Sequence, residues 1–358
     1  MRLFYLDEQK TGCYLYRGLI PMEELKKLGH TAEFINPLQG HANLEPYDAG
    51  IFARGYVGEI MNPVIALKRA GRKIIFDTDD AIDVIPDFNV FQTPMINALP
   101  NFFMMLQMAD LITVTSERLK RHVEQFTRKP IAVLPNCVRE EDWQMRRGGN
   151  KMLRIGFAGS NTHVRDILIA LEALVALQEK GYEFEFVLFG FGVESTFDSW
   201  ADRNRIGMGK MAHIHPFGEA LDRMEELIKQ LKHFRWEKGV PFNEYPERLS
   251  ELNFDIGLAP IEANEFNACK SCIKFYEYAM VGTPTIASNL PPFSDEMEKS
   301  DLVDNEPEAW EKKLAQMMDG EAVRTQMAEK QREWVLEERP ASKWAKAREE
   351  AYRSIGLK

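Results

Sequence analysis

Cysteine is scarce in this sequence, and long apolar runs are missing altogether. The chain holds four cysteines among 358 residues, which is typical of free thiols in a reducing compartment rather than of a disulfide scaffold. No segment approaches the roughly 18 consecutive apolar residues that span a membrane, and the apolar run at the N-terminus is too short for a signal peptide. Repeats and low-complexity segments are also missing. These absences predict a soluble, cytoplasmic, globular protein.

An excess of positive charge is missing as well. The chain carries 45 Lys and Arg against 55 Asp and Glu, which gives a formal net charge of −10. An acidic protein does not by default present a broad surface that follows phosphates, so extended nucleic-acid binding is disfavoured, although a local basic groove is compatible with this balance. With 45% hydrophobic residues, a chain of this length has enough apolar surface for two domains.

Apolar runs alternate with amphipathic segments through both halves of the chain, which predicts parallel sheets covered by helices on both faces. The expected strands of the first half are 2–6, 31–35, 48–53, 73–77, 111–115 and 131–136. Those of the second half are 153–160, 184–190, 213–218, 254–260 and 283–288. A helix is expected over 221–234.

A polar stretch with a Gly-Gly pair separates the two halves and is typical of a linker. We therefore expect an α/β protein with two doubly wound, Rossmann-like domains, at 1–140 and 153–335, joined by a linker at 141–152. The charged segment 336–358 is expected to form an amphipathic helix. Ligands bind at the carboxyl ends of the strands in such sheets, and two facing domains create a cleft between them.

Cys269 and Cys272 form a C-x-x-C pair, a spacing found in zinc and redox sites. A structural zinc ion needs four ligands, and the other two cysteines lie in the first half of the chain. The sequence around the pair does not resemble the helix start of a thioredoxin-type redox site. We therefore interpret both cysteines as small buried or half-buried thiols and expect no metal site.

The helix expected over 271–281 follows the strand at 254–260 and a polar loop, so it begins at the carboxyl edge of the second sheet. Free backbone N–H groups and the helix dipole favour an anion there. Lys270 and Lys274 share one helix face, and Glu277 lies one turn further on. A diphosphate needs cations and N–H donors, and a ribose diol needs a carboxylate acceptor. A surface Lys–Glu pair on an ordinary helix explains the same residues when they are taken alone.

This helix does not stand alone in the sequence. The pattern Lys274-x-x-Glu277-Tyr278, continued by Gly282 and Pro284, resembles the donor segment of GT-B glycosyltransferases and is most similar to family 4, in its phage and bacterial branch. Further segments with this resemblance are 13–30, 134–138 and 155–166. The resemblance implies two Rossmann-like domains that face each other across a cleft, with the C-terminal helix crossing back to the first domain. It also implies a nucleotide-diphosphate sugar as co-substrate, with UDP favoured, and neither a tightly bound cofactor nor a divalent metal.

The resemblance, together with the chemistry and position of the side chains, assigns roles to individual residues. The residues expected to bind the donor are Gly159, Ser160, Arg165, Lys270, Ser271, Lys274 and Glu277. Those expected to take part in catalysis are Lys274, Glu277, Asp79 and His163. Glu277 would hold the ribose hydroxyls, the Gly159–Ser160 turn would approach the diphosphate, and the basic side chains would stabilise the leaving diphosphate. His163 is a candidate for binding sugar or phosphate, and a solvent-facing position explains it equally well.

One position departs from the family pattern. Many family-4 enzymes carry two glutamates separated by seven residues, and Cys269 stands at the first of these two positions. The resemblance implies a transfer that is metal-independent and retains the configuration of the sugar. The missing carboxylate usually contacts the transferred sugar, so the identity of the sugar and the retaining stereochemistry stay open. The same departure leaves open a degenerate, non-catalytic protein that binds nucleotide or glycan. A sugar-phosphate epimerase or a phosphorylase of the same architecture is a third hypothesis.

Asp77, Thr78 and Asp79 form a D-x-D pattern directly after an expected strand, and Asp80 follows. In GT-A transferases this pattern holds a divalent metal on the donor diphosphate, but a second complete α/β domain favours GT-B here. We interpret Asp79 or an acidic neighbour as lining the cleft and orienting an acceptor hydroxyl. An Asp-rich helix start without a ligand is the alternative. The resemblance suggests a glycan, a lipid-linked sugar or a hydroxylated base in phage DNA as the acceptor, and it leaves the oligomeric state open.

Three aromatic residues near the expected cleft have two interpretations each. Tyr16 lies near the first strand-to-helix turn and could face the cleft, although an ordinary helix position is slightly favoured. Phe242 and Tyr245 precede a short helix of the second half. Stacking on the nucleobase and packing in the core are equally compatible with their positions.

Overall fold

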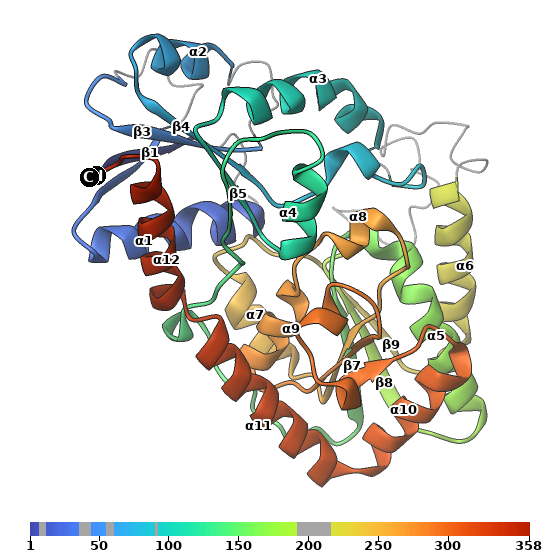
Figure 1. The fold of residues 1–358 in the computed structure, drawn as a ribbon. Helices are drawn as coiled ribbons and strands as arrows, with labels where there is room; N and C mark the ends of the chain where they lie inside the picture. The colour runs from blue at the N-terminus through green and yellow to red at the C-terminus, as the bar shows by residue number, and fades with distance from the viewer. Residues whose placement is uncertain (7–11, 36–43, 55–60, 90–91, 192–215) are drawn as a thin grey trace.

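Two parallel sheets, each of six strands, organise the residues that the computed structural model describes, which are 1–6, 12–35, 44–54, 61–89, 92–191 and 216–358 (Figure 1). The first sheet has the strand order β2-β1-β3-β4-β5-β6. Its strands are β1 (Arg2–Leu6), β2 (Thr31–Ile35), β3 (Ala49–Ala53), β4 (Lys73–Thr78), β5 (Leu111–Val114) and β6 (Ile131–Val133).

The second sheet has the order β12-β11-β10-β7-β8-β9. Its strands are β7 (Leu153–Ala158), β8 (Phe184–Phe189), β9 (Phe234–Glu237), β10 (Ile256–Ala259), β11 (Thr285–Ser288) and β12 (Leu302–Val303). The chain builds this sheet outward from β7 in one direction and then outward from β10 in the other. In doubly wound sheets the ligand binds at such a reversal, outside the carboxyl ends of the strands.

Helices cover both faces of each sheet. The first sheet packs against α1 (Ile20–Lys27) and α12 (Ala341–Ser354) on one face, and against α2 (Met61–Arg69), α3 (Gln92–Met108) and α4 (Glu117–Val123) on the other. The second sheet packs against α5 (Val164–Glu179), α6 (Pro216–Gln230) and α10 (Pro307–Asp319) on one face, and against α7 (Tyr245–Leu252) and α9 (Ile273–Met280) on the other. Two further helices are α8 (Glu265–Ala268) and α11 (Glu321–Glu338).

Alternation along β1 shows how the sequence dictates these layers. Successive side chains of a strand point to opposite faces of the sheet. Leu3 and Tyr5 therefore pack under α1 and α12, whereas Phe4 and Leu6 pack under the helices of the opposite face. All four side chains are buried, so both faces of the strand must be apolar, as expected for a parallel sheet with two helical layers.

The structure corrects several predictions in the second half. The predicted strand at 213–218 is wrong where it can be judged, because α6 begins at Pro216, a residue that suits the first turn of a helix; residues 213–215 lie outside the described part. The helix predicted over 221–234 ends at Gln230, and Phe234–Glu237 forms the edge strand β9. The polar loop before α9 contains α8, which begins at the N-cap Asn264.

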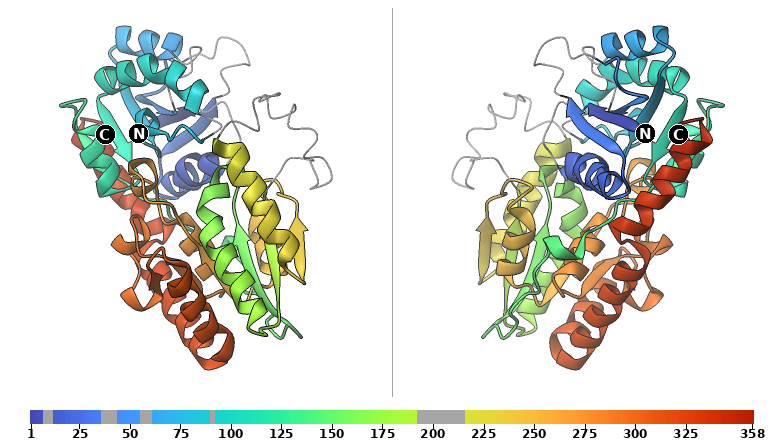
Figure 2. Two further views of the ribbon diagram at one scale, coloured as in Figure 1. Left: turned by 90° about the vertical axis from the view of Figure 1, so that its right-hand side faces the viewer. Right: turned by 90° about the vertical axis from the view of Figure 1, so that its left-hand side faces the viewer.

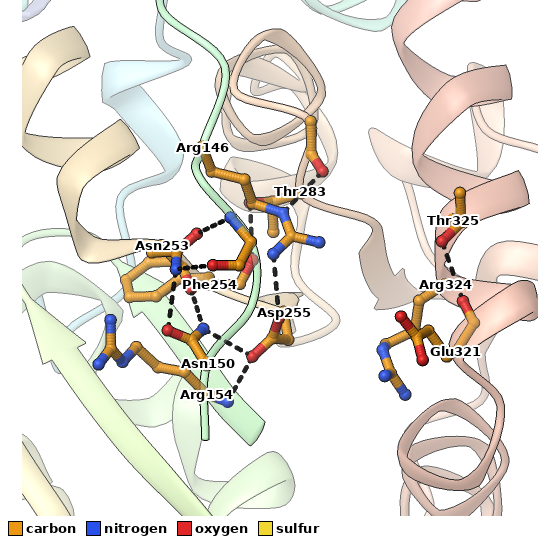
Figure 3. Close-up of polar contacts among 12 residues, drawn as sticks. Arg146, Asn150, Arg154, Asn253, Phe254, Asp255, Thr283, Glu321, Arg324 and Thr325 are labelled. Atoms are coloured by element: carbon orange, nitrogen blue, oxygen red, sulfur yellow. Dashed lines mark hydrogen bonds and ion pairs between the residues drawn. The ribbon is translucent and has the colours of Figure 1, made fainter. Parts of the chain in front are cut away.

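The polar stretch before β7 is pinned to the base of the second sheet (Figure 3). Asp255 accepts hydrogen bonds from Nη1 of Arg146 at 3.0 Å and from Nδ2 of Asn150 at 2.8 Å. Asn253, in the left-handed conformation with φ of 56°, exchanges hydrogen bonds with both the N–H and the carbonyl of Gly148. This stretch is therefore fixed to the second domain rather than a loose connection.

The chain crosses between the domains twice, and the two crossings lie side by side. Val138 pairs with Pro340 as a parallel bridge, in which Val138 N–H donates to the carbonyl of Arg339 and Ala341 N–H donates to the carbonyl of Val138, both at 2.9 Å. After the second crossing α12 runs along α1, where Tyr352 is fully buried against the first sheet. Both ends of the chain therefore lie in the first domain (Figure 2).

Candidate functional site

The carboxyl edges of the two sheets face each other, as contacts between segments that follow the strands show. Asn136, after β6, donates to Oγ of Ser271 at 2.9 Å, and Ser116, after β5, donates to the carbonyl of Cys269 at 3.2 Å. Arg118 forms two hydrogen bonds with the carboxylate of Asp295, at 2.5 and 2.8 Å. The segment that follows β10, one of the two strands at which the second sheet reverses, thus lies at the domain boundary.

Gly159 follows β7, and the absence of a side chain at this position leaves room for neighbouring groups of the site. A Cβ atom at this position would lie 2.8 Å from Cε1 of Phe157 and 3.1 Å from Nζ of Lys274. The N–H of Gly159 donates to the carbonyl of Phe189 at 2.9 Å, so this group is occupied by the sheet. The glycine therefore allows the ammonium group of Lys274 to approach the turn after β7.

Two lysines meet at the start of α9. Burial lowers the pKa of Lys274 to about 8, with Lys270 adding to this effect and Glu277 opposing it. The ammonium of Lys274 also lies over the ring of Phe157, 5.2 Å from its centroid. Two neighbouring cations that repel each other at the positive end of a helix form a site in which an anion is stabilised.

Glu277 lies in α9, is 8% exposed, and has a hydrogen-bond donor on each carboxylate oxygen. Tyr16 of the first domain donates to Oε1 at 2.8 Å, and Tyr245 of the second domain donates to Oε2 at 2.9 Å. Burial raises the pKa of Glu277, while both tyrosine hydroxyls and Lys274 act in the opposite direction. The ring of Tyr245 stacks on Phe189. Tyr16 lies in the helical segment Tyr14–Leu19 and faces the domain boundary.

The loop after β7 and the first turn of α5 carry three further candidates. Oγ of Ser160 lies 2.9 Å from Oγ1 of Thr162, and Nδ1 of His163 lies 2.6 Å from Oδ2 of Asp166. Arg165 forms an ion pair with Glu262 at 2.5 Å, and its guanidinium lies over the ring of Phe88, 4.2 Å from the centroid. Because Phe88 belongs to the first domain, Arg165 links the two domains rather than joining the two lysines.

The three aspartates after β4 occupy different environments. Asp77 is 1% exposed and forms a buried ion pair with Arg17 at 2.7 Å, so it is not free to orient a ligand. Asp79 and Asp80 each lie 3.4 Å from the guanidinium of Arg54. Burial and the neighbouring Asp79 raise the pKa of Asp80 to about 6. Asp79 and Asp80 are more exposed than Asp77, with 15% and 26% of their side chains accessible, and both form ion pairs with Arg54.

The two cysteines of the C-x-x-C pair are buried, as predicted, and point into different apolar clusters. Cys269 packs with the core of the first domain, together with Phe4 and Ile82. Cys272 packs with Phe275 and Ile261 in a cluster that spans both domains. Among the described residues, no group of three or more His, Cys, Asp or Glu side chains is arranged to hold a metal ion.

Several solved structures share this architecture over nearly their whole length. A glycosyltransferase from Rickettsia africae aligns with a TM-score of 0.67, 16% identity, and coverage of 99% of this chain and 98% of that one. HepE from Anabaena in complex with UDP aligns with a TM-score of 0.65, 11% identity, and coverage of 99% and 100%. The chain has the GT-B fold. A GT-B neighbour described as an alpha-glucosyltransferase in complex with UDP aligns with a TM-score of 0.64 and 10% identity, covering 99% of both chains.

Comparison with protein-family models and with curated proteins finds no match, so the likeness rests on the GT-B fold. None of the helices in the described residues is long and apolar enough to cross a membrane.

No motif in the sequence points to Asp166 or Asn267, whose side chains link the start of α5 to the segment after β10. The spacing of Asp166, three residues after His163 on the first turn of α5, is a signal that could have identified it. Asn267 donates a hydrogen bond to Asp166 from a segment about 100 residues away in the sequence. No local sequence pattern predicts that contact.

Proposed function

We propose that this chain is a glycosyltransferase that moves a sugar from a nucleotide-diphosphate sugar, with UDP as the favoured nucleotide, to a hydroxyl of an acceptor. The observation that carries the proposal is the convergence of Lys270, Lys274, Gly159 and Glu277 at the reversal point of the second sheet. Two lysines beside a turn whose glycine has no side chain can bind a diphosphate, and a carboxylate one helical turn away can accept hydrogen bonds from a ribose diol. The neighbours HepE, solved with UDP and with UDP-glucose, and the alpha-glucosyltransferase support the choice of UDP.

The proposed roles follow from charge. Lys270 and Lys274 stabilise the leaving diphosphate as its charge develops, an electrostatic effect that is strong where water is excluded. When the donor binds, Glu277 replaces its hydrogen bond from Tyr16 or Tyr245 with hydrogen bonds from the ribose hydroxyls. Asp79, with Asp80, orients the acceptor hydroxyl from the opposite domain. Arg165, Ser160 and Ser271 shape the donor site through the contacts described above.

The two domains divide the substrates in this proposal. Residues 153–335 bind the donor and residues 1–140 bind the acceptor, and closure of the domains excludes the water that would hydrolyse the donor. The transfer proceeds with retention and without a divalent metal, as in the family-4 enzymes that the sequence resembles. The acceptor is a glycan, a lipid-linked sugar or a hydroxylated base of phage DNA, and the reaction takes place in the cytoplasm.

A non-catalytic protein that binds a nucleotide sugar is the second candidate. The observation that favours it is Cys269, which stands where the resemblance places a carboxylate and is only 4% exposed. Such a protein would bind the donor through the same lysines but would neither transfer nor hydrolyse it.

The first test is a thermal-shift panel of UDP-, GDP-, ADP-, dTDP- and CMP-linked sugars, with Mn²⁺ or EDTA. A ligand that binds the native state raises its apparent stability. We expect the largest shift with UDP-sugars and no effect of EDTA. A shift that requires Mn²⁺ would contradict the metal-independent site, and no shift with any member would contradict the proposed function.

The second test is donor turnover by Lys274→Ala and Glu277→Ala, measured as release of nucleoside diphosphate. Loss of one electrostatic donor to a developing charge costs about 100-fold in rate, which is the effect expected for Lys274→Ala. Lys229→Ala, which removes an exposed lysine of α6, is the matched control. Binding without turnover in the wild-type protein would favour the second candidate.

A further inference from the structure

Asp166 joins the two loops of the candidate donor site. It lies in the first turn of α5 and is 5% exposed. Its Oδ2 lies 2.6 Å from Nδ1 of His163, in the loop after β7. Its Oδ1 accepts hydrogen bonds from the N–H of Glu262 at 2.7 Å and from Nδ2 of Asn267 at 3.3 Å, both in the segment after β10. One buried carboxylate therefore fixes the position of His163 relative to the segment that carries Lys270.

These contacts also fix the protonation of the His163 ring. An ionised carboxylate only accepts hydrogen bonds, so the proton of the pair lies on Nδ1. Burial, with the nearby ammonium groups of Lys274 and Lys270, lowers the pKa of His163 to about 3, so the ring is neutral at neutral pH. Nε2 then carries a lone pair and acts as an acceptor. Within the described part of the chain, Nε2 has no hydrogen-bond partner.

A neutral ring with its proton on Nδ1 binds ligand groups that donate a hydrogen bond to Nε2. The oxygens of an ionised diphosphate are acceptors, so they cannot pair with Nε2, which is an acceptor as well. A hydroxyl group donates to Nε2 readily. In the proposed function the ribose hydroxyls bind Glu277 and the acceptor hydroxyl binds Asp79 from the first domain, so the hydroxyls that remain for His163 are those of the transferred sugar.

We infer that His163, positioned by Asp166, accepts a hydrogen bond from a hydroxyl of the transferred sugar and thereby contributes to the choice of donor sugar. The site is then divided by chemistry, since Lys270 and Lys274 hold the phosphates and a neutral imidazole holds the sugar. The inference rests on the proposed function, because it requires a nucleotide-sugar donor at this site.

The test compares two ligands by isothermal titration calorimetry. These are the nucleotide sugar with the largest thermal shift in the panel above and the nucleoside diphosphate that lacks its sugar. His163→Ala weakens binding of the nucleotide sugar by about 3- to 10-fold, the effect of one hydrogen bond, and leaves the Kd of the nucleoside diphosphate within twofold of wild type. His233→Ala, which removes an exposed histidine next to β9, is the control and leaves both constants unchanged.

Asp166→Asn tests the positioning role separately. The amide oxygen can still accept from Glu262, while the amide nitrogen donates to Nδ1 of His163, which moves the ring proton to Nε2. ¹⁵N NMR of the ring shows an Nδ1–H tautomer in the wild-type protein and an Nε2–H tautomer in the variant. Binding of the nucleotide sugar weakens in the variant while binding of the nucleoside diphosphate is maintained. Nucleotide sugars that lack one sugar hydroxyl then identify the hydroxyl that binds His163. Removal of that hydroxyl weakens binding to the wild-type protein but does not weaken binding to His163→Ala any further.

Three results would overturn the inference. One is an equal loss of affinity for both ligands in His163→Ala, which would place the ring on the diphosphate. Another is unchanged affinity for the nucleotide sugar in that variant, and the third is an Nε2–H tautomer in the wild-type protein. Failure of every nucleotide sugar to bind wild type is a different outcome, since it removes the proposed function itself.

Discussion

Replacing Tyr16 with Phe tests the contact that ties the first domain to the candidate donor site. The hydroxyl of Tyr16 lies 2.8 Å from Oε1 of Glu277, and the two side chains are 5% and 8% exposed. Phe keeps the ring volume, so the substitution removes a hydrogen bond without opening a cavity in the surrounding cluster. A hydrogen bond to a charged group contributes about 1.5–3 kcal/mol, and we expect the free energy of unfolding to fall by about this amount.

Urea denaturation followed by tryptophan fluorescence measures this loss. Tyr245→Phe is the matched comparison, because Tyr245 donates to the other oxygen of Glu277 at 2.9 Å but belongs to the second domain. We expect losses of similar size for the two variants, since each leaves one buried carboxylate oxygen without its donor. If Tyr16→Phe changes the free energy of unfolding by less than about 0.5 kcal/mol while Tyr245→Phe destabilises the protein, the contact between the domains does not form in solution and the reasoning is refuted.

Two further predictions concern pH. Burial lowers the pKa of Lys274 to about 8, so the side chain is increasingly neutral above pH 8. Binding of UDP then requires protonation of Lys274, and its affinity should fall by up to about tenfold per pH unit. A Kd that is flat from pH 7 to pH 9 by calorimetry would contradict the role of Lys274. His122 lies between Asp83 and Glu265, with ring nitrogens 2.8 and 2.9 Å from their oxygens. Because carboxylates only accept, both ring nitrogens carry protons, and the hydrogen bond to Asp83 leads in raising the pKa of His122 against the opposing effect of burial. This contact is therefore complete below the ordinary histidine pKa and is lost as pH rises through the folded-state pKa. Glu265→Gln should lower the pKa of His122 in an NMR titration, and an unchanged value would show that the contact between α4 and α8 is absent.

The sequence was sufficient for the two parallel sheets because buried strands between helices leave a strong local pattern. It failed at β9, where Phe234–Glu237 is a short edge strand of half-buried residues. Its residues follow an amphipathic helix directly and extend that periodic pattern by a few positions. The two-residue strand β12 is too short to leave any pattern.

The candidate site was predictable only in part, for a different reason. Lys270, Lys274 and Glu277 lie on one short segment, so their spacing could be interpreted locally. The partner of Glu277 in the first domain is 261 residues away in the sequence, and its identity depends on how the domains meet. A single sequence contains no local signal for such a contact.

The paired crossings at Val138 and Pro340 divide the domain interface into two regions with different costs of separation. Beside the crossings lies an apolar cluster that includes Cys137, Val138 and Phe275, and exposing it to water is expensive in proportion to its area. Along α4 the contacts between the domains are mostly polar. Among them, the Arg118–Asp295 ion pair has side chains 36% and 41% exposed, and water replaces such a contact at little cost. Separation should therefore start at α4 and proceed as a rotation about the two crossings, so that the boundary opens on the α4 side while the region around the crossings stays assembled.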